Sequence, residues 1–350
     1  MVRRIPTILT IAVLVLFGWG LRTAEAKYQY GRSTGSGQPT GFFFFGEGVW
    51  TNPRNVDAVV ATTESVEDFG GGVNTLTEIL PDWEDEVAWR FGGGYSWASG
   101  NKLVVSYWSF DADQSAAGSG PLGGITHFAV GPPIRTGGGF VGNQGSPGSY
   151  GLTTTIEAST ADVAFGRPHE LTEGFKLEWS LGLRWANYEE TTEGFYDEAA
   201  IGSPDLGRNT YFASKSNEGD MIGVRAAVHG GYRFAKAFSL DAGVGVSFLD
   251  GELTASSGLT PTGLDNSITT PSSYIEINDD GRSGNIWDVD VTVSWYAVGE
   301  AVRLWVGWEQ QNWDDIPADL VRNFPGTTAP LRERDSVTFS GYKLGVFVRF

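Results

Sequence analysis

The last stretch of the chain, Asp335 to Phe350, restricts the possible folds more than any other. One parity is apolar and consists of Tyr342, Leu344, Val346, Val348 and Phe350. The other is mixed and consists of Lys343, Gly345, Phe347 and Arg349. A period of two predicts a β-strand with two unlike faces. Such a strand lies at a sheet edge unless the sheet closes into a barrel, where the last strand pairs with the first.

The N-terminal segment has the order of a secretory signal peptide. Arg3 and Arg4 precede an apolar run over residues 5–21, and the small-x-small motif Ala24-Glu25-Ala26 follows. We expect cleavage after Ala26. A retained membrane anchor is the alternative, and Pro6 and the Ala-x-Ala site argue against it. Domain organisation is then a signal peptide over residues 1–26, a Gly/Ser/Gln-rich, flexible periplasmic lead over residues 27–40, and a barrel over residues 41–350.

Charge and composition argue against several classes of protein. The net charge is −18, and removing residues 1–26, which carry +2, leaves −20. An acidic exported chain is a poor nucleic-acid binder, because such binding needs basic patches. The chain has no cysteine, so packing or membrane burial must hold it together. Its 49 Gly and 13 Trp with only 19% charged residues suit membrane barrel strands with aromatic girdles. A soluble β-sandwich or propeller is the alternative.

Alternating patterns predict ten strands. They cover residues 42–50, 85–97, 102–111, 151–166, 175–185, 219–234, 238–248, 285–296, 302–309 and 335–350. Short turns fall near residues 98–101, 167–172, 235–237 and 297–300. Long loops fall near residues 51–84, 112–150, 190–218, 250–284 and 310–334.

The connections therefore alternate long and short along the whole chain. This asymmetry is typical of outer-membrane barrels, which have long extracellular loops and short periplasmic turns. An even strand number places both termini on the periplasmic side. We therefore predict an all-β fold, an antiparallel transmembrane β-barrel of about ten strands in the bacterial outer membrane.

In such a barrel the apolar parity faces lipid and the polar parity faces the lumen. The predicted lumen-lining charges are Glu86, Arg90, Lys176, Glu178, Arg184, Arg225, His229, Arg233, Asp241, Asp288, Asp290, Arg303, Glu309, Lys343 and Arg349. These residues mix both signs. They predict either a structural network of ion pairs that fills a narrow interior or a charged constriction that selects solutes. Ten strands lie near the closed end of the size range, which favours the network.

Several stretches resemble a known family. They are Pro81-Asp82-Trp83 followed by WRFGGGYSW, Trp108 to Phe110, GLRWANYEE from Gly182, Met221 to Arg225, FSLDAGVGVSFLDGEL from Phe238, VGWEQQNW from Val306 and the closing SGYKLGVFVRF. In this order they resemble the Legionella major outer membrane protein family of pore-forming barrels. The stretch Val228-His229-Gly230 departs from the pattern. The strand ending in an aromatic residue also resembles the C-terminal assembly signal of outer-membrane barrels, here Tyr342, Leu344, Val346, Val348 and Phe350.

The resemblance implies a porin-like passive pore for small solutes or ions. A closed structural or adhesin-like surface barrel is the alternative. The expected partners are outer-membrane lipid and lipopolysaccharide, the barrel-assembly machinery, and small solutes or ions.

An outer-membrane lipid-modifying enzyme is the weakest reading, because the chain has only three histidines, His127, His169 and His229. His229 could reach Ser239 or Asp241, but a lumen role is favoured. No H-E-x-x-H motif occurs. We expect no enzyme activity, no cofactor and no metal site. The acidic groups at residues 278–280 and 314–315 could attract calcium or magnesium, but solvated surface is the favoured interpretation.

Deleting Phe350 is expected to impair membrane insertion, because the final strand must pair and present its apolar parity to lipid. Heat-modifiable migration of the membrane fraction on a gel measures insertion. Wild-type levels of inserted protein would show that Phe350 is not needed for assembly.

Overall fold

A computed structural model describes residues 40–54, 61–65, 75–79, 83–121, 147–198, 209–263, 273–297, 301–316 and 336–350. The signal peptide and almost all of the lead predicted from the sequence lie outside these residues. Ten strands close a barrel in the order β1-β12-β11-β10-β9-β8-β7-β6-β5-β4, and every neighbouring pair is antiparallel. β2 and β3 form a separate two-stranded sheet.

The barrel strands fall into a short and a long group. The short strands are β1 (Gly41–Arg54), β4 (Glu86–Ser96), β11 (Val302–Asp314) and β12 (Ser336–Arg349). The long strands are β5 (Lys102–Pro121), β6 (Pro147–Thr172), β7 (Phe175–Glu198), β8 (Asn209–Ala235), β9 (Phe238–Gly263) and β10 (Ser273–Ala297). The small sheet consists of β2 (Ala61–Ser65) and β3 (Thr75–Ile79).

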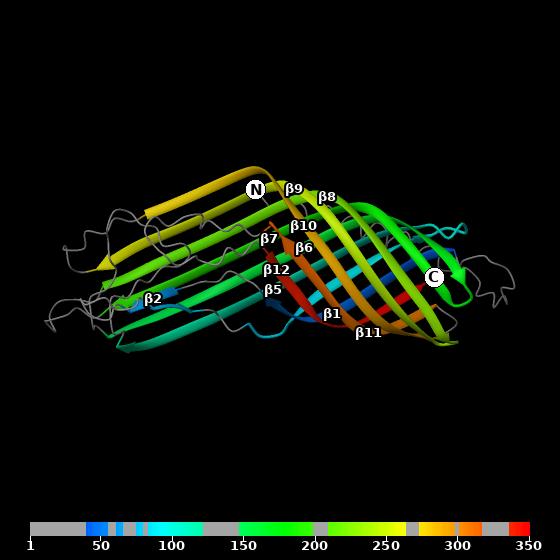
Figure 1. Ribbon diagram of the computed structural model, residues 1–350, viewed down its shortest axis with the longest axis horizontal. Coiled ribbons are helices and arrows are strands. Elements are labelled where there is room, and N and C mark those ends of the chain that lie inside the picture. Colours follow the sequence, from blue (N-terminus) through cyan, green and yellow to red (C-terminus); the bar gives the residue numbers. More distant parts are fainter. Residues whose placement is uncertain are drawn as a thin grey trace.

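The first and last barrel strands close the cylinder. β1 pairs with β12 from Phe43 opposite Arg349 to Arg54 opposite Thr338. The backbone N–H of Phe350 adds a hydrogen bond of 2.9 Å to the carbonyl of Phe42. β1 therefore starts, and β12 ends, at the end of the barrel that carries the short turns (Figure 1). The prediction of a ten-stranded antiparallel barrel with this arrangement is confirmed.

The six long strands run well beyond the predicted spans, and their far ends project past the short strands (Figure 1). Much of the predicted loops at residues 112–150, 190–218 and 250–284 is strand, so these loop boundaries were wrong. Outside lipid a strand needs no apolar parity, and polar residues such as Thr153, Thr191 and Ser216 pair there in register. Apolar alternation in the sequence therefore identifies only the part of each strand that lies in the membrane.

One turn boundary was also wrong. β6 continues through the predicted turn at residues 167–172, with an irregular register between Glu170 and Thr172. The chain reverses instead at Glu173 and Gly174, and Gly174 has a φ of +84°. Glycine adopts this left-handed conformation without a steric penalty.

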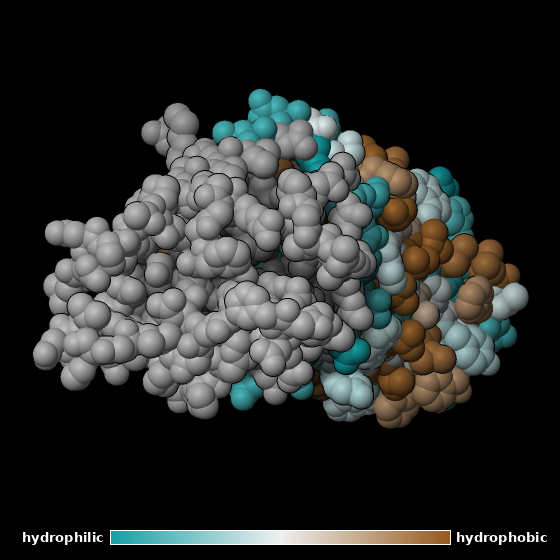
Figure 2. All heavy atoms as spheres, turned by 60° about the vertical axis from the view of Figure 1, so that its left-hand side comes forward, coloured by the Kyte–Doolittle hydropathy of each residue, from teal (hydrophilic) through white to brown (hydrophobic). Residues whose placement is uncertain are grey.

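A band of exposed apolar side chains surrounds the half of the barrel that carries the short turns (Figure 2). Exposed fractions reach 57% for Leu181, 54% for Val244 and 58% for Val306. On β7 the outward apolar residues run from Phe175 to Trp185, a length that fits a tilted membrane-spanning strand. Within the described part of the chain, no helix is long and apolar enough to cross a membrane.

Just above this band, the outward face of the long strands is acidic. Asp111, Glu157, Glu189 and Glu218 stand directly opposite one another on β5, β6, β7 and β8. Like charges in this arrangement repel across the sheet. Partial burial, together with the carboxylates of Glu157 and Glu218, raises the pKa of Glu189 above its usual range.

Replacing Glu189 with Gln is expected to raise the free energy of unfolding at pH 7. A raised pKa in the folded state means that Glu189 favours folding at acidic pH and opposes it as the pH rises above the ordinary glutamate range. The gain should therefore shrink towards acidic pH, and salt should reduce it because the group is largely exposed. Urea unfolding followed by tryptophan fluorescence measures both effects.

Glu193→Gln is the matched control. Glu193 lies on the same face of β7, but Thr153 and Ser214 stand opposite it. Equal gains from the two substitutions would contradict the proposed repulsion within the acidic row.

Candidate functional site

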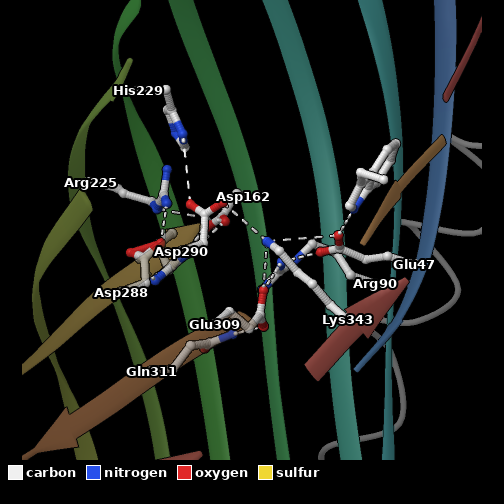
Figure 3. Close-up of polar contacts among 12 residues, drawn as sticks. Glu47, Arg90, Asp162, Arg225, His229, Asp288, Asp290, Glu309, Gln311 and Lys343 are labelled. Carbon is white, nitrogen blue, oxygen red and sulfur yellow. Dashed lines mark hydrogen bonds and ion pairs between the residues drawn. The ribbon is translucent and has the colours of Figure 1, made fainter. Parts of the chain in front are cut away.

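Charged side chains from eight strands meet inside the barrel at the depth of the apolar band (Figure 3). On one side are Glu47 of β1, Arg90 of β4, Glu309 of β11 and Lys343 of β12. Arg90 donates two hydrogen bonds to Glu309, of 2.8 and 3.0 Å, and also pairs with Glu47. Lys343 Nζ lies 3.2 Å from Glu309 Oε2. We call these four residues the first cluster.

On the other side are Asp162 of β6, Arg184 of β7, Arg225 of β8 and Asp288 of β10, which form the second cluster. Arg184 donates to both oxygens of Asp162, at 2.6 and 2.8 Å, and Arg225 donates to Asp288. Two longer contacts of 3.9 Å join Arg184 to Asp288 and Arg225 to Asp162. The two arginines and two aspartates therefore form a closed ring of ion pairs.

Asp290 of β10 connects the two clusters. Its Oδ2 accepts a hydrogen bond of 3.2 Å from Lys343, and its Oδ1 lies 3.9 Å from His229 Nδ1 on β8 (Figure 3). We call the two clusters together with Asp290 the charged layer. Exposure varies within the layer: Arg184, Glu309 and Lys343 are 4–5% exposed, whereas the side chains of Arg90, Asp288 and Asp290 are 22–25% exposed.

Glycines on β9 make room for this layer. Gly243 stands between His229 and Asp290, and Gly245 stands next to Asp288, so side chains of β8 and β10 meet across β9. A Cβ at Gly245 would overlap Asp288 Oδ2 and Arg225 Nη2. From Ala242 to Val246 glycine alternates with apolar residues, which keeps an apolar lipid-facing parity and leaves the lumen-facing parity without side chains at Gly243 and Gly245.

Gly345 on β12 has the same function in the first cluster. The indole of Trp305 lies over Gly345, and a Cβ there would overlap it. From this position Trp305 Nε1 donates a hydrogen bond of 2.9 Å to Glu47 Oε2. Glu47 is thereby held between an indole and Arg90.

An apolar level follows further from the short turns. It contains Trp108, Phe110, Tyr188, Trp313 and Phe339, all at most 2% exposed. Trp108 and Phe339 pack at 5.4 Å between ring centroids, and Trp313 and Phe339 at 5.8 Å. The interior is thus filled at two successive depths, first by ion pairs and then by aromatic rings.

Gln311 joins the two levels. Its Nε2 lies 3.5 Å from Glu309 Oε1, and its Oε1 accepts a hydrogen bond of 3.4 Å from Trp313 Nε1. A single buried amide therefore connects the charged layer to the apolar level above it.

The structure brings some of the predicted lumen residues together and leaves others apart. Those in the charged layer are Arg90, Arg184, Arg225, Asp288, Asp290, Glu309 and Lys343, with His229 beside it. Those elsewhere in the barrel are Glu86, Lys176, Glu178, Arg233, Asp241, Arg303 and Arg349.

The residues nearer the short turns make different contacts. Glu178 pairs with Lys102, and Asp241 accepts hydrogen bonds from Ser239 and Ser294 at 2.8 and 2.9 Å. Arg233, Arg303 and Arg349 lie over the aromatic rings of Tyr296, Trp305 and Phe347, at 4.5 to 5.5 Å from the ring centroids. At one end of β7, Lys176 is exposed, and at the far end of β4, Glu86 is half-buried.

Sequence reasoning missed Glu47, Lys102 and Asp162. Glu47 lies between two glycines in a Phe-rich strand, and Asp162 lies in a strand with a weak pattern. One feature of the sequence could have identified these residues. Each is a charged residue within a strand, on the face opposite aromatic or β-branched residues of the same strand. Such a charge is costly on the lipid face.

The predicted catalytic alternative is not assembled among the described residues. The Ser239 hydroxyl donates to Asp241, and His229 lies beside Asp290 instead. The described residues contain no group of three or more His, Asp or Glu side chains arranged to hold a metal ion.

Gly245→Ala is expected to destabilise the barrel, because its methyl group must displace the Arg225–Asp288 pair. Disturbing a buried pair costs up to about 3–5 kcal/mol. The control is Gly230→Ala on β8, whose Cβ would meet nothing closer than Phe175 at 3.8 Å. Urea unfolding of the refolded barrels compares the two. A loss no larger for Gly245→Ala than for Gly230→Ala would argue against the packing described here.

Comparison with known proteins shows likeness at the level of fold alone. No family model matches the chain, and no curated protein matches it. Among solved structures, the outer membrane protease OmpT from Escherichia coli is 12% identical, with a TM-score of 0.34 over 91% of this chain and 99% of that one. The toluene transporter TbuX from Ralstonia pickettii is 9% identical, with a TM-score of 0.27 over 89% and 90%. The toluene transporter TodX from Pseudomonas putida is 9% identical, with a TM-score of 0.24 over 89% and 90%.

Proposed function

We propose that this chain is a closed outer-membrane barrel that carries a six-stranded sheet on the outside of the membrane. One observation supports the proposal most strongly: the interior is filled at two successive depths, by the charged layer and by the aromatic level. The protein would then act through the surface that it presents, as a structural or adhesin-like barrel does, and not by conducting solutes.

Energetics favour the closed state. A hydrated ion that crosses the layer must separate bidentate pairs such as Arg184–Asp162 and Arg90–Glu309. Breaking a buried pair costs about 3–5 kcal/mol, because the remaining charge is left without a partner. The ion would then meet Trp108 and Trp313, which offer no polar path. Ten strands enclose only a narrow interior, so there is little room for these side chains to move aside.

A porin-like passive pore is the second candidate. The observation that favours it is the unequal charge of the layer, which would give a conducting barrel a preference for cations. Its carboxylates are Glu47, Asp162, Asp288, Asp290 and Glu309, and its cations are Arg90, Arg184, Arg225 and Lys343. In a pore of this kind Arg225→Ala would shift selectivity towards cations, and Asp290→Ala would shift it towards anions.

The location and partners follow from the outward face. The apolar band would contact outer-membrane lipid, and the acidic long strands above it would lie beside lipopolysaccharide headgroups. The outward side chains Tyr342, Leu344, Val346, Val348 and Phe350 would serve as the signal for the barrel-assembly machinery. The arrangement of Ser239, Asp241 and His229 supports no enzymatic role.

Planar-bilayer recording of the refolded protein separates the two candidates. The closed barrel is expected to give no stable channel steps, whereas the pore is expected to give steps whose reversal potential shifts in opposite directions in Arg225→Ala and Asp290→Ala. Reproducible channel steps in the wild-type protein would overturn the proposal, and opposite shifts in the two variants would then favour the pore.

A further inference from the structure

The charged layer does not balance at neutral pH. It holds five carboxylates and four permanent cations, so one negative charge has no counterpart. Within each cluster the charges cancel, with two carboxylates and two cations. The excess charge is Asp290, which shares Lys343 with Glu309 and Glu47.

His229 is the side chain placed to supply the missing charge. Its Nδ1 lies 3.9 Å from Asp290 Oδ1, with only Gly243 between them on β9. Its side chain is 46% exposed, while that of Lys343 is 6% exposed, so solvent reaches the imidazole of His229. Histidine is the side chain that ordinarily changes its charge between about pH 5 and 8.

The other charges near His229 lie on each strand beside it. Glu178 stands directly opposite on β7 and pairs with Lys102. Asp241 stands one step along the inward face of β9, nearer the short turns. On β8 itself, Arg225 and Arg233 lie four residues to either side on the same face, where Arg225 is bound to Asp288 and Arg233 lies over Tyr296.

We propose that His229 and Asp290 form a proton-operated lock in the barrel interior. Proton uptake from the short-turn side makes His229 a cation and gives Asp290 an ion-pair partner of its own. The layer is then neutral, and Lys343 is left to Glu47 and Glu309. Mild acid therefore tightens the contact of β8 with β10 across the glycine face of β9.

Unfolding of the full-length mature barrel in detergent tests the lock at about pH 8 and about pH 5.5. The folding equilibrium constant of the wild-type protein is expected to gain roughly two- to fivefold more on acidification than that of His229→Gln, the range expected for one partly exposed ion pair. The control is His169→Gln. The imidazole of His169 lies on the exposed outer face and accepts a hydrogen bond from Trp179 Nε1, a contact that proton uptake cannot strengthen, so this variant should keep at least the wild-type gain.

Asp290→Asn is the second test, and it applies even if His229→Gln does not insert. This substitution leaves four carboxylates and four cations in the layer, so protonating His229 no longer balances it, and the gain at acidic pH should be lost. A full wild-type gain in either His229→Gln or Asp290→Asn would overturn the lock. Loss of the gain in His169→Gln would overturn it as well, because the response would then arise from the outer face.

Discussion

The pairing of β1 with β12 is the constraint on which the rest of the structure depends. Lipid offers no hydrogen-bond partners, so every backbone group of a membrane-spanning sheet must be bonded within the sheet. Twelve cross-strand pairs from Phe43–Arg349 to Arg54–Thr338 meet this need where the cylinder closes. Closure also separates the two faces of every strand, because one parity then meets lipid and the other meets an enclosed space.

That enclosed space sets the chemistry of the interior. Charged residues cannot face lipid without a large cost, so they gather on the inward parity. In so narrow a cylinder these side chains contact one another. They remain charged because they form ion pairs, as Arg184 does with Asp162 and Arg90 with Glu309. Gly243, Gly245 and Gly345 make room for these large side chains, because a glycine has no side chain to fill the space that arginine, lysine and tryptophan occupy.

The long strands change character along their length. Between Phe175 and Trp185, β7 is apolar on its outward parity, and from Asn187 onward the same parity becomes polar and acidic. The hydrogen-bonded ladder with β6 and β8 continues through this change without a break in register. Membrane span and external sheet are therefore one continuous structure, which holds the external sheet rigidly at the membrane surface.

The sequence by itself determined the fold class, the strand number, the end of the barrel at which the short turns lie, and the parity of the membrane-spanning parts of β4 and of β7 to β12. These follow from local alternation, because the lipid boundary imposes it residue by residue. The far ends of β5 to β10 escaped prediction, since polar strands outside lipid carry no apolar period and are specified by their neighbours. Tertiary structure alone decided which charges meet. Glu47 and Glu309 are far apart in the chain, yet both bind Arg90, because barrel closure places β11, β12, β1 and β4 around one narrow space.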